Sequence, residues 1–187
     1  MRPCIGCGKT IDIRGHTGLC RQCWQRNTSF TLTNEQAAYI AGLFDGEAHI
    51  TIYRQVPTRC SKFKTPSYRV IVEIAMTERQ ALDYLNSLLP DAKVVHCFRH
   101  GRRLPYYRLR VIHRQAVHLL TLLLPYFQCK RQHAELCLQF AELQARRTNP
   151  KRPPPGYVQE AEDIYWKLRS IQLNKKPRSK RAVERFI

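Results

Sequence analysis

The chain has few acidic residues: 14 aspartates and glutamates stand against 32 lysines and arginines, which gives a formal net charge of +18 at pH 7. No apolar run approaches the roughly 20 residues that cross a bilayer, and the first residues contain no apolar signal core. We therefore expect an intracellular protein, in cytoplasm, nucleoid or organelle, with no membrane partner. Such an excess of positive charge is typical of a protein that binds nucleic acid.

Four of the eight cysteines form two regular pairs, and 12 residues separate Cys4 and Cys7 from Cys20 and Cys23. Each Cys-x2-Cys pair brings two thiolates within reach of one tetrahedral ion, and the second pair completes the site. Thiols stay reduced inside cells, which favours metal over disulfides. We predict a structural Zn²⁺ in a small zinc ribbon over residues 1–30. Four unrelated buried cysteines are the alternative.

The pattern that follows predicts an α+β core over residues 31–147. A capping box at Thr33 starts a helix that ends near Phe44, with Gly46 as a left-handed residue after it. Alternating apolar residues predict strands, and leucines at helical spacing predict helices. Residues 148–187 are predicted to hold a proline-rich linker, a helix over 158–173 and a basic tail. The expected core elements are strands at 48–56, 68–76, 93–98 and 106–112 and helices at 78–89, 114–124 and 130–146.

The first core helix carries small residues on one face and ends in two carboxylates. Ala38, Ala41 and Gly42 leave a smooth face that lets another helix approach closely. Asp45 and Glu47 follow, and a carboxylate near a helix C-terminus is unfavourable unless a cation compensates it. In a chain of this charge, the expected partner of such a cation is phosphate. An ordinary buried helix is the alternative.

Residues 40–48, with the sequence IAGLFDGEA, resemble the nine-residue signature of the LAGLIDADG homing endonucleases. The element order αββαββα over residues 33–145 is also similar to that family. Ala48 stands where the family usually has glycine. The resemblance implies a site-specific double-strand DNA endonuclease, encoded by a mobile intron, that uses Mg²⁺ or another divalent cation to hydrolyse phosphodiesters at a long pseudo-palindromic site.

The chain carries one copy of the motif, where the family has one or two. One copy implies a homodimer in which the two motif helices pack together on a two-fold axis. The expected interface residues are Ala38, Ala41, Gly42 and Asp45.

The resemblance also assigns roles in the active site. Glu47 corresponds to the metal ligand, while Asp45 holds the turn or forms hydrogen bonds across the interface. Lys130 matches a lysine that organises water and phosphate charge, a part that the adjacent Arg131 could also take. Thr77 is our candidate for the polar residue, often glutamine, that the family places at the end of its second strand.

A four-stranded antiparallel sheet can present one face to the major groove of double-stranded DNA, where all base pairs are distinguishable. Strand parity, counted from Glu47 along the strand at 48–56, selects the residues on that face, and a simple solvated polar face is the alternative. The sequence leaves the parity of the strand at 93–98 open, and His96 is the residue that we assign from it. Arg108 and Arg110 suit guanine, Gln55 suits adenine and Glu73 suits cytosine. The strand residues predicted to bind DNA are His49, Thr51, Tyr53, Gln55, Arg69, Glu73, His96, Tyr106, Arg108 and Arg110. The loop residues predicted to do so are His100 and the phosphate-contacting Arg59, Lys62, Lys64, Arg102 and Arg103.

Two other classes of function fit parts of the sequence. A protein of the same fold could act without cleavage, either as an RNA-splicing maturase that binds intron RNA or as a DNA-binding regulator. A zinc-ribbon ribosomal or RNA-processing protein would explain the charge and the cysteines but not the motif helix.

Overall fold

The computed structural model describes residues 2–3, 10–11, 30–57, 65–89, 92–97, 105–147 and 153–174. After residue 33 the elements follow the predicted αββαββα order, and the class is α+β as expected. The elements are β1 (Arg2–Pro3), β2 (Thr10–Ile11), α2 (Asn34–Glu47), β3 (Ala48–Gln55), β4 (Ser67–Met76), α3 (Arg79–Leu88), β5 (Lys93–Cys97), β6 (Tyr106–Ile112), α4 (His113–Leu123), the 3-10 turn η1 (Leu124–Tyr126), α5 (Arg131–Ala145) and α6 (Tyr157–Asn174).

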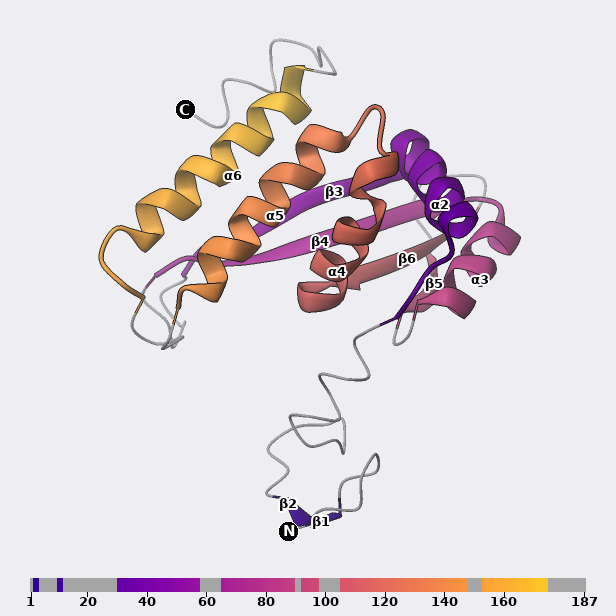
Figure 1. Cartoon of the computed structure of the whole chain (residues 1–187), viewed down its shortest axis with the longest axis horizontal. Coiled ribbons are helices and arrows are strands. Elements are labelled where there is room, and N and C mark those ends of the chain that lie inside the picture. Colours follow the sequence, from indigo (N-terminus) through magenta and orange to yellow (C-terminus); the bar gives the residue numbers. More distant parts are fainter. Residues whose placement is uncertain are drawn as a thin grey trace.

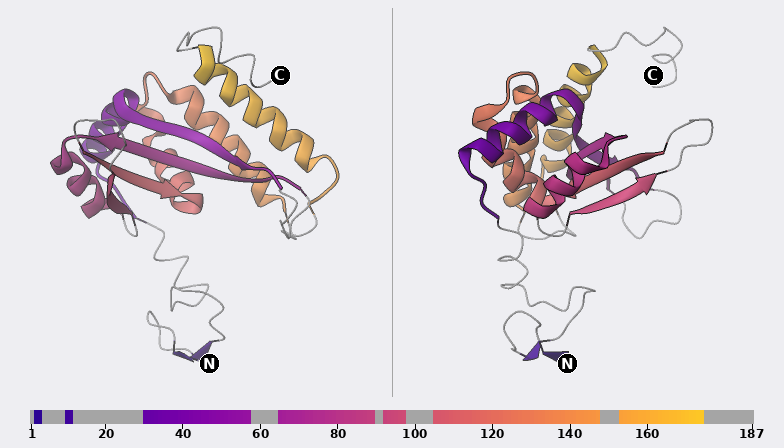
Figure 2. Two further views of the ribbon diagram at one scale, coloured as in Figure 1. Left: turned by 180° about the vertical axis from the view of Figure 1, so that it is seen from behind. Right: turned by 90° about the vertical axis from the view of Figure 1, so that its right-hand side faces the viewer.

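Strands β3, β4, β6 and β5 form an antiparallel sheet in that order, so β3 and β5 are its edges. The helices gather on one side of the sheet (Figure 1; Figure 2, right). Side chains that point to this side, such as Ile50, Ile52, Val72 and Leu109, are each 1% exposed and form the core with the helices. The sheet therefore has a buried side and a side that no described helix covers.

We call the uncovered side the open face. Its residues follow from strand alternation and from the pairing register. Cross-strand pairs such as His49 with Glu73 and Glu73 with Arg110 fix which residues share this face. The open face comprises His49, Thr51, Tyr53 and Gln55 of β3, Ser67, Arg69, Ile71, Glu73 and Ala75 of β4, Tyr106, Arg108, Arg110 and Ile112 of β6, and Lys93, Val95 and Cys97 of β5.

Helix α2 starts at the predicted capping box, with Thr33 N–H donating to Gln36 Oε1 at 3.0 Å and Gln36 N–H donating to Thr33 Oγ1 at 3.2 Å. The helix extends through Glu47, beyond the predicted end at Phe44. Gly46 is part of the helix and does not have a positive φ, which among the described glycines occurs only at Gly156. The expectation of a left-handed Gly46 was wrong.

The residue that departs from the LAGLIDADG signature, Ala48, lies in extended backbone with φ −79° and ψ 149°. This conformation is open to any residue, because only a positive φ favours glycine. Alanine at this position is therefore compatible with the observed turn from α2 into β3.

Helix α6 packs beside α5 and covers the edge strand β3. Tyr157, Ala161, Ile164 and Leu168 form its buried stripe. Gln172 Nε2 donates to the carbonyl oxygen of Ile50 at 3.0 Å, which satisfies a backbone acceptor of the edge strand. The last helix is thus part of the layer that covers the sheet.

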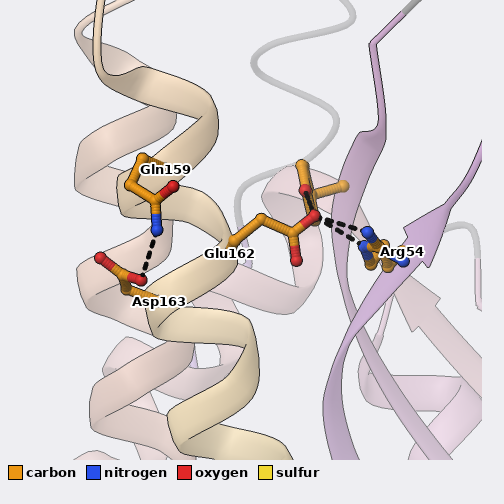
Figure 3. Close-up of polar contacts among 5 residues, drawn as sticks. Arg54, Gln159, Glu162 and Asp163 are labelled. Carbon is orange, nitrogen blue, oxygen red and sulfur yellow. Dashed lines mark hydrogen bonds and ion pairs between the residues drawn. The ribbon is translucent and has the colours of Figure 1, made fainter. Parts of the chain in front are cut away.

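A polar contact fastens α6 to the sheet (Figure 3). Glu162 Oε1 accepts hydrogen bonds from Arg54 Nε at 2.8 Å, Arg54 Nη2 at 2.7 Å and the Tyr68 hydroxyl at 2.7 Å. The side chains of Arg54 and Glu162 are only 28% and 17% exposed. Burial, reinforced by the hydrogen bond to Glu162, raises the pKa of Tyr68 to about 12, so the phenol stays a donor at neutral pH.

Several predicted residues lie outside the described part of the chain. They are the zinc-ligand candidates Cys4, Cys7, Cys20 and Cys23 and the loop residues Arg59, Lys62, Lys64, His100, Arg102 and Arg103. In the N-terminal segment, β1 and β2 pair antiparallel, with Arg2 opposite Ile11. Within the described residues, no helix combines the length and the apolarity that a membrane span requires.

Candidate functional site

The end of α2 is joined to the start of α5 by Asp45. Its carboxylate accepts three backbone N–H bonds, from Gln128 at 2.8 Å, Cys129 at 3.1 Å and Lys130 at 2.8 Å. Burial acts to raise the pKa of Asp45, but the three N–H bonds and the charge of Lys130 outweigh it, and the pKa lies below its usual value. Of the two roles predicted for Asp45, the structure therefore supports the local one, holding a turn within its own chain.

Lys130 makes the reciprocal contact. Its Nζ donates to the carbonyl oxygen of Phe44 at 2.8 Å and to that of Ala48 at 2.6 Å. A cation at these carbonyls compensates the negative end of the helix dipole, and α2 has no basic residue of its own in its last turn. We call this set of contacts between Asp45, Lys130 and their backbone partners the α2–α5 junction. In the sequence, Glu47 lies between Phe44 and Ala48, the two residues whose carbonyls Lys130 binds.

Replacing Asp45 by asparagine should weaken the junction and lower the free energy of unfolding by about 2 kcal/mol, because hydrogen bonds to a charged group are lost. The folded-state pKa of Asp45 is lowered, so its contribution is present above the unfolded pKa of about 4 and is lost as the pH falls through the folded pKa. Urea unfolding at neutral pH and in acid measures both effects. Asp83→Asn is the control, because its exposed ion pair with Arg79 should contribute under about 0.5 kcal/mol. Equal losses in the two variants at neutral pH would contradict the assignment.

Glu47 is exposed and is the last residue of α2, at the corner where the helix meets the open face. Ala48 pairs with Ile74, so the register continued by one residue places Glu47 opposite Ala75. Thr77, our candidate for the polar partner, lies exposed in the bend after β4. The acidic residue of β4 is Glu73, which lies two residues before Ala75 and directly opposite His49 of β3.

His49 lies between the carboxylate-bearing corner and the rest of the open face. Desolvation by the surrounding protein lowers the pKa of His49; Glu73 opposes this effect, while Arg169 and Lys130 add to it. The ring is therefore neutral at pH 7, with one nitrogen to donate and one to accept a hydrogen bond. A neutral imidazole adds no further charge to a face that already carries four arginines and lysines, namely Arg69, Lys93, Arg108 and Arg110.

The arginines of the open face have neighbours that orient them. Glu73 forms ion pairs with Arg110 and Arg108. Arg69 Nη2 donates to Gln55 Oε1 at 3.0 Å, and its guanidinium lies 5.1 Å from the centre of the Tyr53 ring. The predicted parity of β3, β4 and β6 is confirmed, because all of these residues share one face.

The position of His96 in the edge strand β5 differs from the prediction. His96 points to the helix side of the sheet, where its ring stacks on Tyr107 at a centroid distance of 5.0 Å. Lys93 and Val95, which the prediction omitted, pair with Arg110 and Arg108 and so lie on the open face. The parity of β5 was not evident from the sequence, since both alternate sets in this strand mix apolar and polar residues. Only pairing with β6 fixes it.

The small-residue face of α2 is partly confirmed. Ala38 and Gly42 are exposed, and among the described residues a Cβ added at Gly42 would meet no atom within 4 Å beyond its own stretch of helix. Ala41 is 0% exposed and packs into the core of its own chain together with Ala37, Ile40 and Phe44. Its predicted place on the exposed face was therefore wrong, because residue 41 falls on the stripe that faces the sheet.

Solved structures resemble this fold, although no protein-family model and no curated protein sequence matches the chain. The homing endonuclease I-CvuI, in complex with the I-CreI target and Mg, superposes with a TM-score of 0.59 at 22% identity over 78% of this chain and 86% of that chain. The archaeal intron-encoded homing endonuclease I-Vdi141I, complexed with DNA, gives 0.59 at 14% identity over 73% and 84%. The LAGLIDADG homing endonuclease I-LtrWI, bound to target DNA, gives 0.55 at 16% identity over 74% of this chain and 46% of that chain. The chain therefore has the homing endonuclease fold.

Proposed function

We propose that this chain is a site-specific DNA endonuclease of the LAGLIDADG homing endonuclease type, which acts as a homodimer and cleaves double-stranded DNA with a divalent cation. The observation that carries the proposal is the position of Glu47. An exposed carboxylate, supported by the α2–α5 junction, stands at the corner of a sheet face that carries Arg69, Arg108, Arg110 and Lys93.

The residues at this corner fit Mg²⁺. The described residues contain no group of three or more histidines, cysteines, aspartates or glutamates that could hold a metal ion by themselves. Mg²⁺ is commonly bound by one or two carboxylates, with waters and substrate phosphates completing its shell. Glu47 would be the ligand from this chain, with the scissile phosphate as the second partner. I-CvuI has been solved with DNA in the presence of Mg and of Ca.

When bound, such an ion lowers the pKa of water and stabilises charge on a phosphoryl group. The protein's own contribution is to hold the carboxylate in place. Asp45 fixes the α2–α5 junction through three backbone N–H bonds, and Lys130 binds the carbonyls on both sides of Glu47. Lys130 thereby brings a positive charge beside the site, where we propose that it also helps to neutralise the phosphate. Thr77, exposed just beyond β4, remains our candidate for positioning a water.

The open face is the proposed DNA-binding surface. Arg108 and Arg110 are suited to bidentate contact with guanine and Gln55 to contact with adenine, while Ala75 and Val95 offer apolar contacts for thymine methyl groups. The loop residues Arg59, Lys62, Lys64, Arg102 and Arg103 would contact phosphates and position the protein. We further propose that residues 1–30 fold around Zn²⁺ bound by Cys4, Cys7, Cys20 and Cys23.

The homodimer is proposed because the chain has one motif helix with an exposed small-residue face. The chain spans 46% of I-LtrWI and 46% of I-SmaMI, about half of each. Two copies of this chain would supply two Glu47 carboxylates, one for each DNA strand.

Replacing Gly42 by leucine should disrupt this dimer and leave the monomer folded. Among the described residues, a Cβ added at position 42 would meet no atom within 4 Å beyond its own stretch of helix, and leucine favours a helix over glycine by about 1 kcal/mol. We expect the dimer dissociation constant to rise on the order of tenfold to a hundredfold because of overpacking at the interface. Sedimentation equilibrium measures it, with Gln139→Leu on the exposed side of α5 as control. Unchanged self-association of the Gly42→Leu protein would exclude α2 as the dimer contact.

Binding is tested with a duplex library of random sequence, with Ca²⁺ in place of Mg²⁺ to keep the DNA intact. The proposal predicts that the protein selects a long two-fold-related sequence and that its affinity falls steeply with salt. Selection of single-stranded RNA over duplex DNA would favour the splicing maturase instead.

A further inference from the structure

A carboxylate lies among the basic side chains of the open face. Glu73 is on β4, directly opposite Arg110 of β6. Its Oε2 lies 2.5 Å from both Nε and Nη2 of Arg110 and 3.9 Å from Nε of Arg108. The side chain of Glu73 is 24% exposed, against 33% for Arg108 and 47% for Arg110, so it is set deeper than the two guanidinium groups that it binds.

A negative charge at this position weakens any contact with phosphate. The sequence has only 14 acidic residues, yet one of them lies on the proposed DNA-binding face. One carboxylate oxygen of Glu73, Oε2, is already bound to arginine, so Glu73 has a role toward the arginines of its own chain besides the predicted contact with cytosine.

The geometry leaves the arginines able to contact bases. Arginine has five N–H bonds in a planar fork, and the contact with Glu73 uses one edge of the Arg110 fork. The end of the fork, formed by Nη1 and Nη2, can still donate to O6 and N7 of guanine. Arg108 and Arg110 are two residues apart on one strand, about 6.7 Å, which corresponds to roughly two base-pair steps along DNA. A long side chain fixed before binding loses less conformational entropy when it binds.

We infer that Glu73 is a positioning residue for sequence recognition, which orients Arg110 and Arg108 to read guanine and weakens binding to all other sequences. The inference rests on the proposed DNA-binding function and adds the source of its specificity. It makes two predictions of opposite sign for Glu73→Gln. Discrimination at the base pairs read by the two arginines falls, and affinity for unrelated DNA rises because a negative charge is removed.

The test uses the duplex library of random sequence in Ca²⁺, followed by sequencing of the bound fraction. Wild-type protein should enrich guanine at two positions, about two steps apart in each half-site. In Glu73→Gln the preference for guanine there should fall by roughly 5- to 150-fold, the range for loss of a bidentate contact. Base preferences at the other positions of the site should not change, and the affinity for the unselected duplex library should increase.

Two further variants make the result specific. Glu142→Gln removes the same charge from the exposed side of α5, away from the open face, and should change neither quantity. Arg110→Lys keeps the charge but loses the fork, so it should lower guanine preference at one of the two positions and thereby identify it.

The outcomes separate this inference from the proposed function. If the wild-type protein binds no duplex and enriches no sequence, the proposed function fails. If it enriches a site and Glu73→Gln enriches the same site equally well, the inference alone is overturned. A change in cleavage rate without a change in base preference would also overturn it, because Glu73 would then act at the scissile phosphate.

Discussion

The Glu47→Gln protein is expected to lose cleavage of duplex DNA by roughly a thousandfold or more, since the neutral amide is a poor ligand for a cation that contributes several kcal/mol to the reaction. DNA binding should remain, because the open face and the α2–α5 junction are not altered. Glutamine has the size of glutamate and continues the helix, so the fold should not change. Single-turnover cleavage of a selected site in Mg²⁺ measures the rate, and retention of the same duplex in Ca²⁺ measures binding.

The matched control is Glu35→Gln, which removes a carboxylate from the exposed first turn of the same helix. It should cleave at the wild-type rate. Wild-type cleavage by Glu47→Gln would exclude Glu47 as the metal ligand. A parallel loss of binding and cleavage would show that the residue supports the fold or the interface rather than the reaction.

The Glu162→Ala protein should be destabilised by about 3 kcal/mol, because the change removes three hydrogen bonds and leaves the Arg54 guanidinium partly buried without its carboxylate. This loss corresponds to a decrease in melting temperature of roughly 6 to 12 °C for a chain of this size. Because α6 covers the edge strand β3, the backbone amides of β3 should also become less protected against hydrogen exchange. Thermal unfolding and hydrogen exchange of β3 measure the two effects.

Asp163 supplies the control, because it is the next residue of α6 and is exposed (Figure 3). Its contact is a hydrogen bond from Gln159 Nε2 to Oδ1 at 3.0 Å on the helix surface. Asp163→Ala should cost under about 0.5 kcal/mol. If both variants lose the same stability, the Arg54–Glu162 contact does not fasten α6 to the sheet.

The sequence predicted the elements whose signals are local. The capping box of Thr33 and Gln36 marked the start of α2, and the alternation of Ile50 and Ile52 marked both β3 and its buried side. The end of α2 was misplaced because Gly46 resembles a helix terminator, whereas the backbone stays helical through Glu47. There the contacts of Lys130 with the last carbonyls stabilise the final turn, and no local pattern shows a partner that is 86 residues away.

In the candidate site, too, features with a local sequence signal were predicted, and features that depend on distant residues were not. The exposed position of Glu47 and the shared face of Arg108 and Arg110 followed from the motif and from parity within single strands. The contact between Glu73 and Arg110 depends on the pairing of β4 with β6, which parity within one strand cannot supply. For the same reason His96 was assigned to the wrong side of the sheet, and the role of Glu162 had no signal in the sequence at all.

The measurement that tests the central claim most directly is the position of the cuts on both strands of a selected duplex. Wild-type protein with Mg²⁺ should cut each strand once, at two phosphates related by the two-fold axis of the site, and EDTA should abolish both cuts. Binding without any cut in Mg²⁺, or cuts on one strand only, would contradict a homodimeric endonuclease with one Glu47 for each strand.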